Sequence, residues 1–299
     1  MKADKPSTTS MMVALGSYCV AQEISDGKVD PRIRDILCVM LSSSPQPFAL
    51  LARLSRLRFV RLALEKLMNL VIPGMFTHYL ARKLFIESRI RNAIAEGCRQ
   101  VVVIGGGLDT LALRISQDFP NLRVIELDHP ATQNLKTKLI NSLQRKPEGL
   151  SLQPADLTVQ SVSSVLAMNA FDPRQPTVFL IEGVLMYLNE QQVRKTLADI
   201  HSCAGHGSRF VVTFMERSDD GGVAFGRSQK SFVNLWLNRQ SEPFVWGLAP
   251  QNAAPFFDSC GWSVVGISQW EQLSQSVSTV YPAMREPAQG EHVAELTLT

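Results

Sequence analysis

Residues 100–110 read QVVVIGGGLDT, a short run of β-branched residues that ends in three consecutive glycines. An unbroken apolar run of this length is typical of a strand that is buried on both faces of a parallel sheet. The glycines after it carry no side chains, so a nucleotide-like ligand can approach the backbone at the carboxyl end of the strand. This stretch therefore predicts the first strand, turn and helix of a doubly wound α/β sheet.

Six further short apolar runs follow this strand, and segments with a helical pattern separate the early ones. The runs lie at 123–127, 150–152, 177–181, 209–214, 262–267 and 292–298. Helices are expected at 109–117, 130–143 and 191–203, the last behind an Asn189 cap with Gln192 three residues on. The alternation predicts an α/β fold, a Rossmann-like sheet of seven mostly parallel strands with helices on both faces.

The first 96 residues contain no strand pattern and are expected to form an N-terminal helical cap. Helical runs are expected from residue 30 to 40 and from residue 48 to 71. A stretch at about 219–250, rich in aromatic residues, interrupts the alternation and is expected to be a helical insertion or lid. We therefore expect two parts, the cap at 1–96 and a ligand-binding catalytic core at 97–299.

The composition is that of a globular protein, with 45% hydrophobic and 19% charged residues. A net charge of +3 over 299 residues is too small to favour nucleic-acid binding. No apolar run approaches the ~18 residues needed to span a bilayer, which makes a cytoplasmic location the expectation. The five cysteines have no spacing typical of metal ligands, so we expect reduced thiols and no metal site.

The helix expected over residues 50–71 is strongly basic. Five basic residues against one acid give it a local charge of +4 beside a leucine-rich face: Arg53, Arg56, Arg58, Arg61 and Lys66 against Glu65. Such a helix could rest on an anionic membrane, or it could pack as a cap over the ligand cleft. The cap is the simpler interpretation, so membrane association is not expected.

Acidic side chains follow the first two predicted strands. Asp109 stands at the start of the helix after the glycine turn, where its carboxylate would favour a cationic ligand or cap the helix. Asp128 comes 21 residues after Gly107, where doubly wound folds hold ribose hydroxyls, although it could instead cap the helix from Pro130. Thr110 occupies the place of the third glycine in a dinucleotide fingerprint, which makes a nicotinamide-dependent oxidoreductase the weaker interpretation.

Two further acids follow the third and fourth predicted strands. Asp156 and Leu157 form a short turn that could accept a hydrogen bond from an exocyclic amine of a purine and cover its ring, or could be an ordinary loop. Glu182 lies in an apolar stretch, where a carboxylate needs a partner. Either an ammonium group on a ligand or Arg82 would provide one.

Taken in order along the chain, these motifs resemble the leucine carboxyl methyltransferase-like family, class I enzymes that use S-adenosylmethionine. The matching stretches are YLAR at 79–82 with FIE at 85–87, residues 100–110, IELDHP at 125–130 with Lys136, DL at 156–157 and IEGVLMYL at 181–188. The resemblance extends to EPF at 242–244 and CGW at 260–262. Two positions depart from the family pattern, because Gly106 replaces the usual alanine and Leu111 replaces an arginine found in many members.

The resemblance implies S-adenosylmethionine as the cofactor. Arg82 would pair with its carboxylate, Asp128 would hold the ribose, and Glu182 would line the methionyl and acceptor end. Asp156 and Leu157 would recognise adenine. The full set of cofactor-binding residues is Arg82, Gly105, Gly107, Asp109, Asp128, Asp156, Leu157 and Glu182.

The implied function is that of an S-adenosylmethionine-dependent O-methyltransferase that acts on a carboxylate or hydroxyl of a small, polyketide-like acceptor. A carboxylate acceptor needs no general base, whereas a hydroxyl benefits from one. His78 and His129 could approach the site, and neither is assigned as catalytic. Two alternatives stay open: a cofactor-binding regulatory or scaffold relative without activity, and a protein C-terminal carboxyl methyltransferase.

Overall fold

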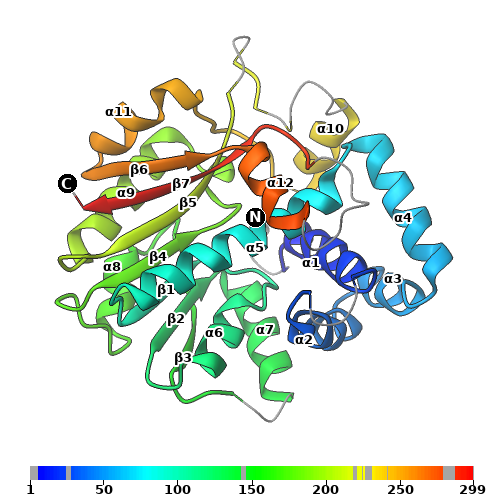
Figure 1. Cartoon of the computed structure of the whole chain (residues 1–299), viewed down its shortest axis with the longest axis horizontal. Helices are drawn as coiled ribbons and strands as arrows, with labels where there is room; N and C mark the ends of the chain where they lie inside the picture. Colours follow the sequence, from blue (N-terminus) through cyan, green and yellow to red (C-terminus); the bar gives the residue numbers. More distant parts are fainter. Residues whose placement is uncertain are drawn as a thin grey trace.

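The computed structural model describes residues 6–24, 28–142, 146–217, 221–223, 225, 231–240, 242–278 and 287–298. Within these residues the centre of the fold is a seven-stranded sheet in the order β3-β2-β1-β4-β5-β7-β6 (Figure 1). The strands are β1 Gln100–Ile104, β2 Arg123–Asp128, β3 Leu150–Pro154, β4 Thr177–Ile181, β5 Arg209–Met215, β6 Trp262–Ser268 and β7 Glu291–Leu298. Strands β1 to β5 are parallel, and β7 runs antiparallel to both β5 and β6. The predicted mostly parallel α/β sheet is therefore confirmed.

Helices pack on both faces of the sheet because neighbouring residues of each buried strand point to opposite sides. Val101 and Val103 of β1 face one apolar core, while Val102 and Ile104 face the other. The described helices are α1 Thr8–Ala21, α2 Pro31–Ser42, α3 Phe48–Leu54, α4 Arg58–Val71, α5 Met75–Ala95, α6 Leu111–Asp118, α7 Pro130–Ser142, α8 Val162–Ala167, α9 Glu190–Cys203, α10 Ser231–Gln240, α11 Ala253–Asp258 and α12 Trp270–Ser278. Helices α8, α9 and α11 contribute to the second core, and the helices before β1 join the first.

The start of α9 has the predicted capping box. The Asn189 side chain accepts a hydrogen bond from the Gln192 amide at 2.9 Å, and the Gln192 side chain accepts one from the Asn189 amide at 2.9 Å. Two backbone donors at the start of the helix are thereby satisfied.

The single helix predicted over residues 48–71 is wrong, because the chain forms α3 and α4 with a break between them. Ser55 ends α3 and donates its hydroxyl to the Ala52 carbonyl at 2.8 Å. The Arg61 guanidinium donates to the carbonyls of Ser55 and Arg56 at 2.9 and 3.0 Å. These side-chain donors satisfy carbonyls at the end of α3, so the chain can become extended at Leu57 and then start a second helix.

The predicted division into a cap at 1–96 and a core at 97–299 stays a prediction. Helices α1, α2 and α5 share one continuous apolar core with a face of the sheet. Of the expected insertion at 219–250, residues 219–220, 224, 226–230 and 241 lie outside the described residues. Residues 231–240 are helical, whereas 242–249 form neither helix nor strand. Among the described residues, no helix is both long and apolar enough to cross a membrane.

Candidate functional site

A cavity of about 290 Å³ lies between the carboxyl ends of the central parallel strands and helices α1, α2 and α5. Parallel strands end at the same edge of a sheet, and the connections after β1, β2, β3 and β4 therefore meet there. The cavity is lined by every residue that the sequence placed at a ligand site: Arg82, Gly105, Gly107, Asp109, Asp128, Asp156, Leu157 and Glu182.

The glycine turn after β1 needs its glycines for both conformation and space. Gly105 and Gly107 have φ angles of +74° and +52°, in the left-handed region that favours glycine. A Cβ on Gly105 would lie 2.2 Å from a methyl group of Val184. A Cβ on Gly106 would lie 2.4 Å from the Glu126 carboxyl carbon, so glycine at this departure from the family pattern makes room for that carboxyl group.

Asp128, at the end of β2, is hydrogen-bonded to this turn. Its carboxylate accepts hydrogen bonds from the backbone amides of Gly107 and His129. Burial raises the pKa of Asp128 above its usual value, although these two hydrogen bonds act in the opposite direction. A carboxylate can accept about four hydrogen bonds, so Asp128 keeps acceptor capacity on the cavity side.

Glu182 is paired with Arg82, which was one of the two partners considered for it. Arg82 Nε donates to Glu182 Oε1 at 2.9 Å, and the same guanidinium contacts Glu291 on β7. Glu291 Oε2 also lies 2.7 Å from His78 Nε2. Burial alone would lower the pKa of Arg82, but the charges of Glu291 and Glu182 raise it overall. His78 thus lies behind Arg82 and does not line the cavity, whereas His129 does.

Lys83 belongs to the same charged cluster and was not among the site residues predicted from the sequence. Its ammonium contacts the Asp109 carboxylate and lies 3.2 Å from Glu182 Oε1. Asp109 also accepts the Leu111 amide at 2.9 Å and so caps the start of α6. Burial alone would raise the pKa of Asp109, but Lys83 lowers it overall. Glu87, one helical turn after Lys83, lines the cavity too, and this spacing is the signal that could have pointed to Lys83.

A second buried ion pair lies behind the glycine turn. Lys136 Nζ is 2.7 Å from Glu126 Oε2, and both side chains are buried. Burial raises the pKa of Glu126, which the charge of Lys136 offsets only in part. The other carboxyl oxygen, Oε1, has no hydrogen-bond partner among the described residues. Glu126 lines the cavity, but this oxygen is itself buried.

Asp156 forms a tight turn with its neighbours at the cavity wall. It accepts the Thr158 amide at 2.9 Å and the Thr158 hydroxyl at 2.6 Å. The hydroxyl bond is the main reason that the pKa of Asp156 is lowered. The turn leaves Leu157 beside Asp156 in the lining.

Helix α1 covers the cavity on the side away from the sheet. Thr9 and Ser10 line it, and the Thr9 amide donates to Glu242 at 3.2 Å. Tyr187 and Glu242 line the same end. The predicted capping role of the basic helix is wrong, because no residue of α3 or α4 is in the lining and α1 occupies that place. Tyr187 and Glu242 lie within stretches that resemble the family but were assigned no role from the sequence, since the residues of this end come from three distant segments.

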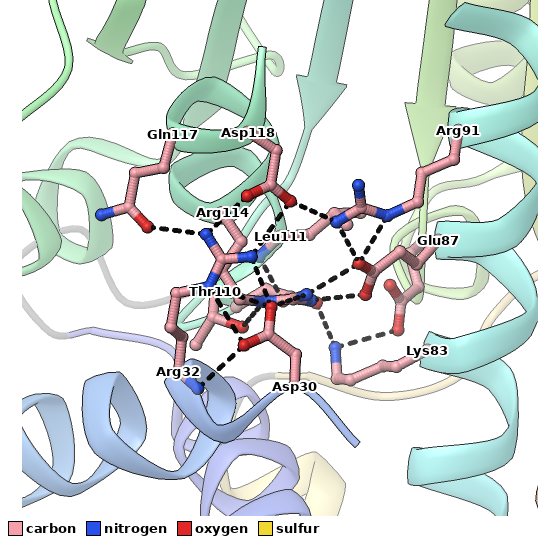
Figure 2. A network of polar contacts seen from close by, with 12 residues as sticks. Asp30, Arg32, Lys83, Glu87, Arg91, Thr110, Leu111, Arg114, Gln117 and Asp118 are labelled. Carbon is pink, nitrogen blue, oxygen red and sulfur yellow. Dashed lines mark hydrogen bonds and ion pairs between the residues drawn. The ribbon is translucent and has the colours of Figure 1, made fainter. Parts of the chain in front are cut away.

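A charge network joins the cavity wall to the N-terminal helices (Figure 2). Arg114 of α6 donates to both Glu87 oxygens, at 2.8 and 2.7 Å, and lies 3.3 Å from Asp30 at the start of α2. Arg32 of α2 and Arg91 of α5 each donate a hydrogen bond to the Asp118 carboxylate at the end of α6. Among the described residues, no cluster of three or more His, Cys, Asp or Glu side chains is arranged to hold a metal ion.

Comparison with known proteins agrees with this arrangement. The family model described as leucine carboxyl methyltransferase matches residues 23–201, which is more than half of the chain. The chain belongs to this family. A "Putative S-adenosyl-L-methionine-dependent methyltransferase" of Mycobacteroides abscessus is 28% identical over 204 residues, which cover 66% of this chain and 65% of the relative. A protein of Frankia alni with the same description is 27% identical over 184 residues, with 60% of each chain covered.

The chain therefore spans about three fifths of the length of these curated relatives. Among solved structures, a DUF574 family protein from Streptomyces avermitilis superposes with a TM-score of 0.60 at 15% identity. That superposition covers 96% of this chain and 97% of the other. At this identity the likeness establishes the α/β fold.

Proposed function

We propose that this member of the leucine carboxyl methyltransferase family is an S-adenosylmethionine-dependent O-methyltransferase whose acceptor is a carboxylate or hydroxyl of a small molecule. The observation that carries the proposal is the convergence of the eight predicted cofactor residues on one cavity, with Asp128 bound to the glycine turn. The names of the relatives, which describe S-adenosylmethionine-dependent methyl transfer, support the same conclusion.

The residues of the cavity fit this cofactor chemically. Gly105 and Gly107 leave the backbone bare where the methionyl part would pack. Asp128 retains acceptor capacity for ribose hydroxyls, and Asp156 with Leu157 supplies an acceptor and an apolar surface for adenine. Arg82 has five N–H donors, so a carboxylate of the cofactor can bind it in addition to its two protein partners.

The cofactor supplies a methyl group on a positively charged sulfur, and its leaving group is neutral. The protein has mainly to hold the acceptor oxygen in line with that methyl group, and such alignment can supply several kcal/mol of the barrier. Arg82, held by Glu182 and Glu291, would hold the carboxylate end of the cofactor, and Asp128 would hold the ribose. We assign the acceptor to the end of the cavity lined by Thr9, Tyr187 and Glu242.

Titration calorimetry with S-adenosylmethionine and S-adenosylhomocysteine tests the cofactor assignment, with NAD as the negative control. We expect both adenosyl ligands to bind and NAD not to bind. Asp128→Ala and Arg82→Ala should each weaken binding about tenfold or more, because each removes charge-assisted hydrogen bonds. The exposed Lys195→Ala on α9 is the matched control and should bind like the wild type.

Melting curves of the variants separate a lost contact from a lost fold. Unchanged affinity in both folded variants would contradict the site assignment. Methyl transfer from labelled cofactor to a panel of small carboxylic acids and phenols then tests the activity. Cofactor binding without transfer to any acceptor, including C-terminal peptides, would instead support the non-catalytic relative.

A further inference from the structure

Helix α4 turns an apolar surface to the solvent. Its side chains Phe59, Leu62, Leu67 and Leu70 are 70%, 41%, 61% and 66% exposed. These four residues, here named the α4 stripe, recur at helical spacing and so share one side of the helix. Figure 1 shows α4 at the edge of the molecule, away from the sheet. Exposed leucines of the preceding segment, Leu50, Leu54 and Leu57, add to this apolar region.

The opposite side of α4 already has its partners within the protein. Arg61 pairs with Glu23 of the segment after α1 at 2.6 Å. At the flank of the stripe, the Asn69 side chain accepts the Gly74 amide at 2.9 Å. Leu64 packs against the apolar core. The orientation of α4 is therefore fixed by contacts of its polar and inner apolar residues, and these contacts leave the α4 stripe facing outward. An apolar helix face of this size normally marks an interaction surface.

The charge around the α4 stripe identifies the kind of partner. Arg53, Arg56 and Lys66 are exposed. The side chain of Arg58 is also 75% exposed, although its Nε lies 3.5 Å from Glu23 Oε2. Glu65 is the one acid between residues 48 and 71, all of which the structure describes. Lys66 lies within the stripe, four residues after Leu62 and four before Leu70. The surface that covers the stripe must therefore combine apolar groups with negative charge that a long lysine side chain can reach.

The sequence favoured a cap over the ligand cleft and not membrane association, but no residue of α3 or α4 lines the cavity. We propose that α3 and α4 dock this protein on an anionic lipid bilayer. An amphipathic helix of this kind lies in the plane of the interface, with Phe and Leu side chains at the acyl boundary and Arg and Lys side chains at the phosphates. A second copy of the chain fits less well, because a two-fold interface through the α4 stripe would bring two basic patches together. The proposal does not depend on the assigned methyl transfer, since α4 contributes nothing to the lining of the cavity.

Vesicle flotation of the full chain at low and high salt tests this docking. The probes are vesicles of phosphatidylglycerol mixed with phosphatidylcholine, and vesicles of phosphatidylcholine alone. We expect binding to the anionic vesicles that weakens with salt. Leu67→Ser with Leu70→Ser should weaken binding at least about tenfold, since both side chains leave the acyl boundary. Arg53→Gln with Lys66→Gln should weaken it about fivefold for each charge removed.

The control variant is Val159→Ser with Met168→Ser, which changes two apolar residues elsewhere that are 80% and 71% exposed and should float like the wild type. Melting temperatures should be the same in all variants because every changed side chain is exposed. Absence of wild-type binding to anionic vesicles would overturn the proposal, and so would equal binding by the Leu67→Ser, Leu70→Ser variant. Sedimentation velocity tests the alternative occupant. If the wild type is a dimer that the Leu67→Ser, Leu70→Ser substitutions dissociate, and if the wild type does not bind vesicles, the surface belongs to a second copy of the chain and the proposal is overturned.

Discussion

Glu291 helps to hold the Arg82 guanidinium in place at one end of the cavity. It is 1% exposed on β7, and one of its oxygens, Oε2, contacts both Arg82 and His78. Burial alone would raise its pKa, but the charge of Arg82 and the contact with His78 lower the pKa from 4.5 to about 2. Glu291 was not singled out in the sequence, because its partner Arg82 lies 209 residues away along the chain.

The depressed pKa predicts a specific acid sensitivity. A carboxyl with a lowered folded-state pKa stabilises the fold fully above its unfolded pKa of 4.5, and this stabilisation is lost as the pH falls toward 2. We expect Glu291→Gln to cost roughly 3 kcal/mol of unfolding free energy at neutral pH and progressively less below pH 4.5. Denaturant titrations of both proteins across this range measure the difference. A difference that stays constant with pH would show that the Glu291 charge contributes nothing.

At the scale of elements, the turn between β1 and α6 fixes the shape of the cavity wall. Gly105 combines a φ of +74° with a Cβ position 2.2 Å from Val184. Neither a left-handed φ nor that contact can be accommodated by alanine without strain. The sequence predicted this turn from the three glycines, and the close approach of Val184 required the structure.

Gly105→Ala should therefore lower the free energy of unfolding by roughly 2 kcal/mol or more. Gly266→Ala on β6 is the matched control, since its added Cβ would meet no atom within 4 Å and its φ is not left-handed. We expect it to change stability by less than about 0.5 kcal/mol. Chemical denaturation measures the free energy of unfolding of both variants. Equal losses for Gly105→Ala and Gly266→Ala would contradict the strain argument.

At the scale of the whole molecule, the network in Figure 2 ties α2, α5 and α6 together around the cavity. Arg114 is at its centre and is 2% exposed. In the part of this network that joins the three helices, three arginines balance three carboxylates: Arg32, Arg91 and Arg114 with Asp30, Glu87 and Asp118. The network thus holds α2 and α5 against α6 at the edge of the sheet through charges that are mutually neutralised.

Arg114→Met should lower the free energy of unfolding by roughly 2 kcal/mol. This is less than the ~3–5 kcal/mol lost when one partner of a buried ion pair is removed, because Arg91 still neutralises Glu87. Limited proteolysis should cut the chain near α2 faster in this variant. Arg174→Met breaks an exposed pair with Asp172 and should change neither measurement. Unchanged stability and proteolysis of Arg114→Met would show that apolar packing alone holds α2 in place.

The sequence by itself determined the sheet and the position of the site. The β-branched run before Gly105 and the alternation of strands and helices are local patterns, and parallel strands necessarily bring Asp109, Asp128, Asp156 and Glu182 to one edge. The tertiary structure alone decided which charges pair: Lys83 with Asp109, and Arg82 with Glu182 and Glu291. It also decided that α1 covers the cavity while α4 turns its apolar stripe outward. Such pairings and orientations depend on residues far apart in the chain, so the residue pattern within a single segment does not predict them.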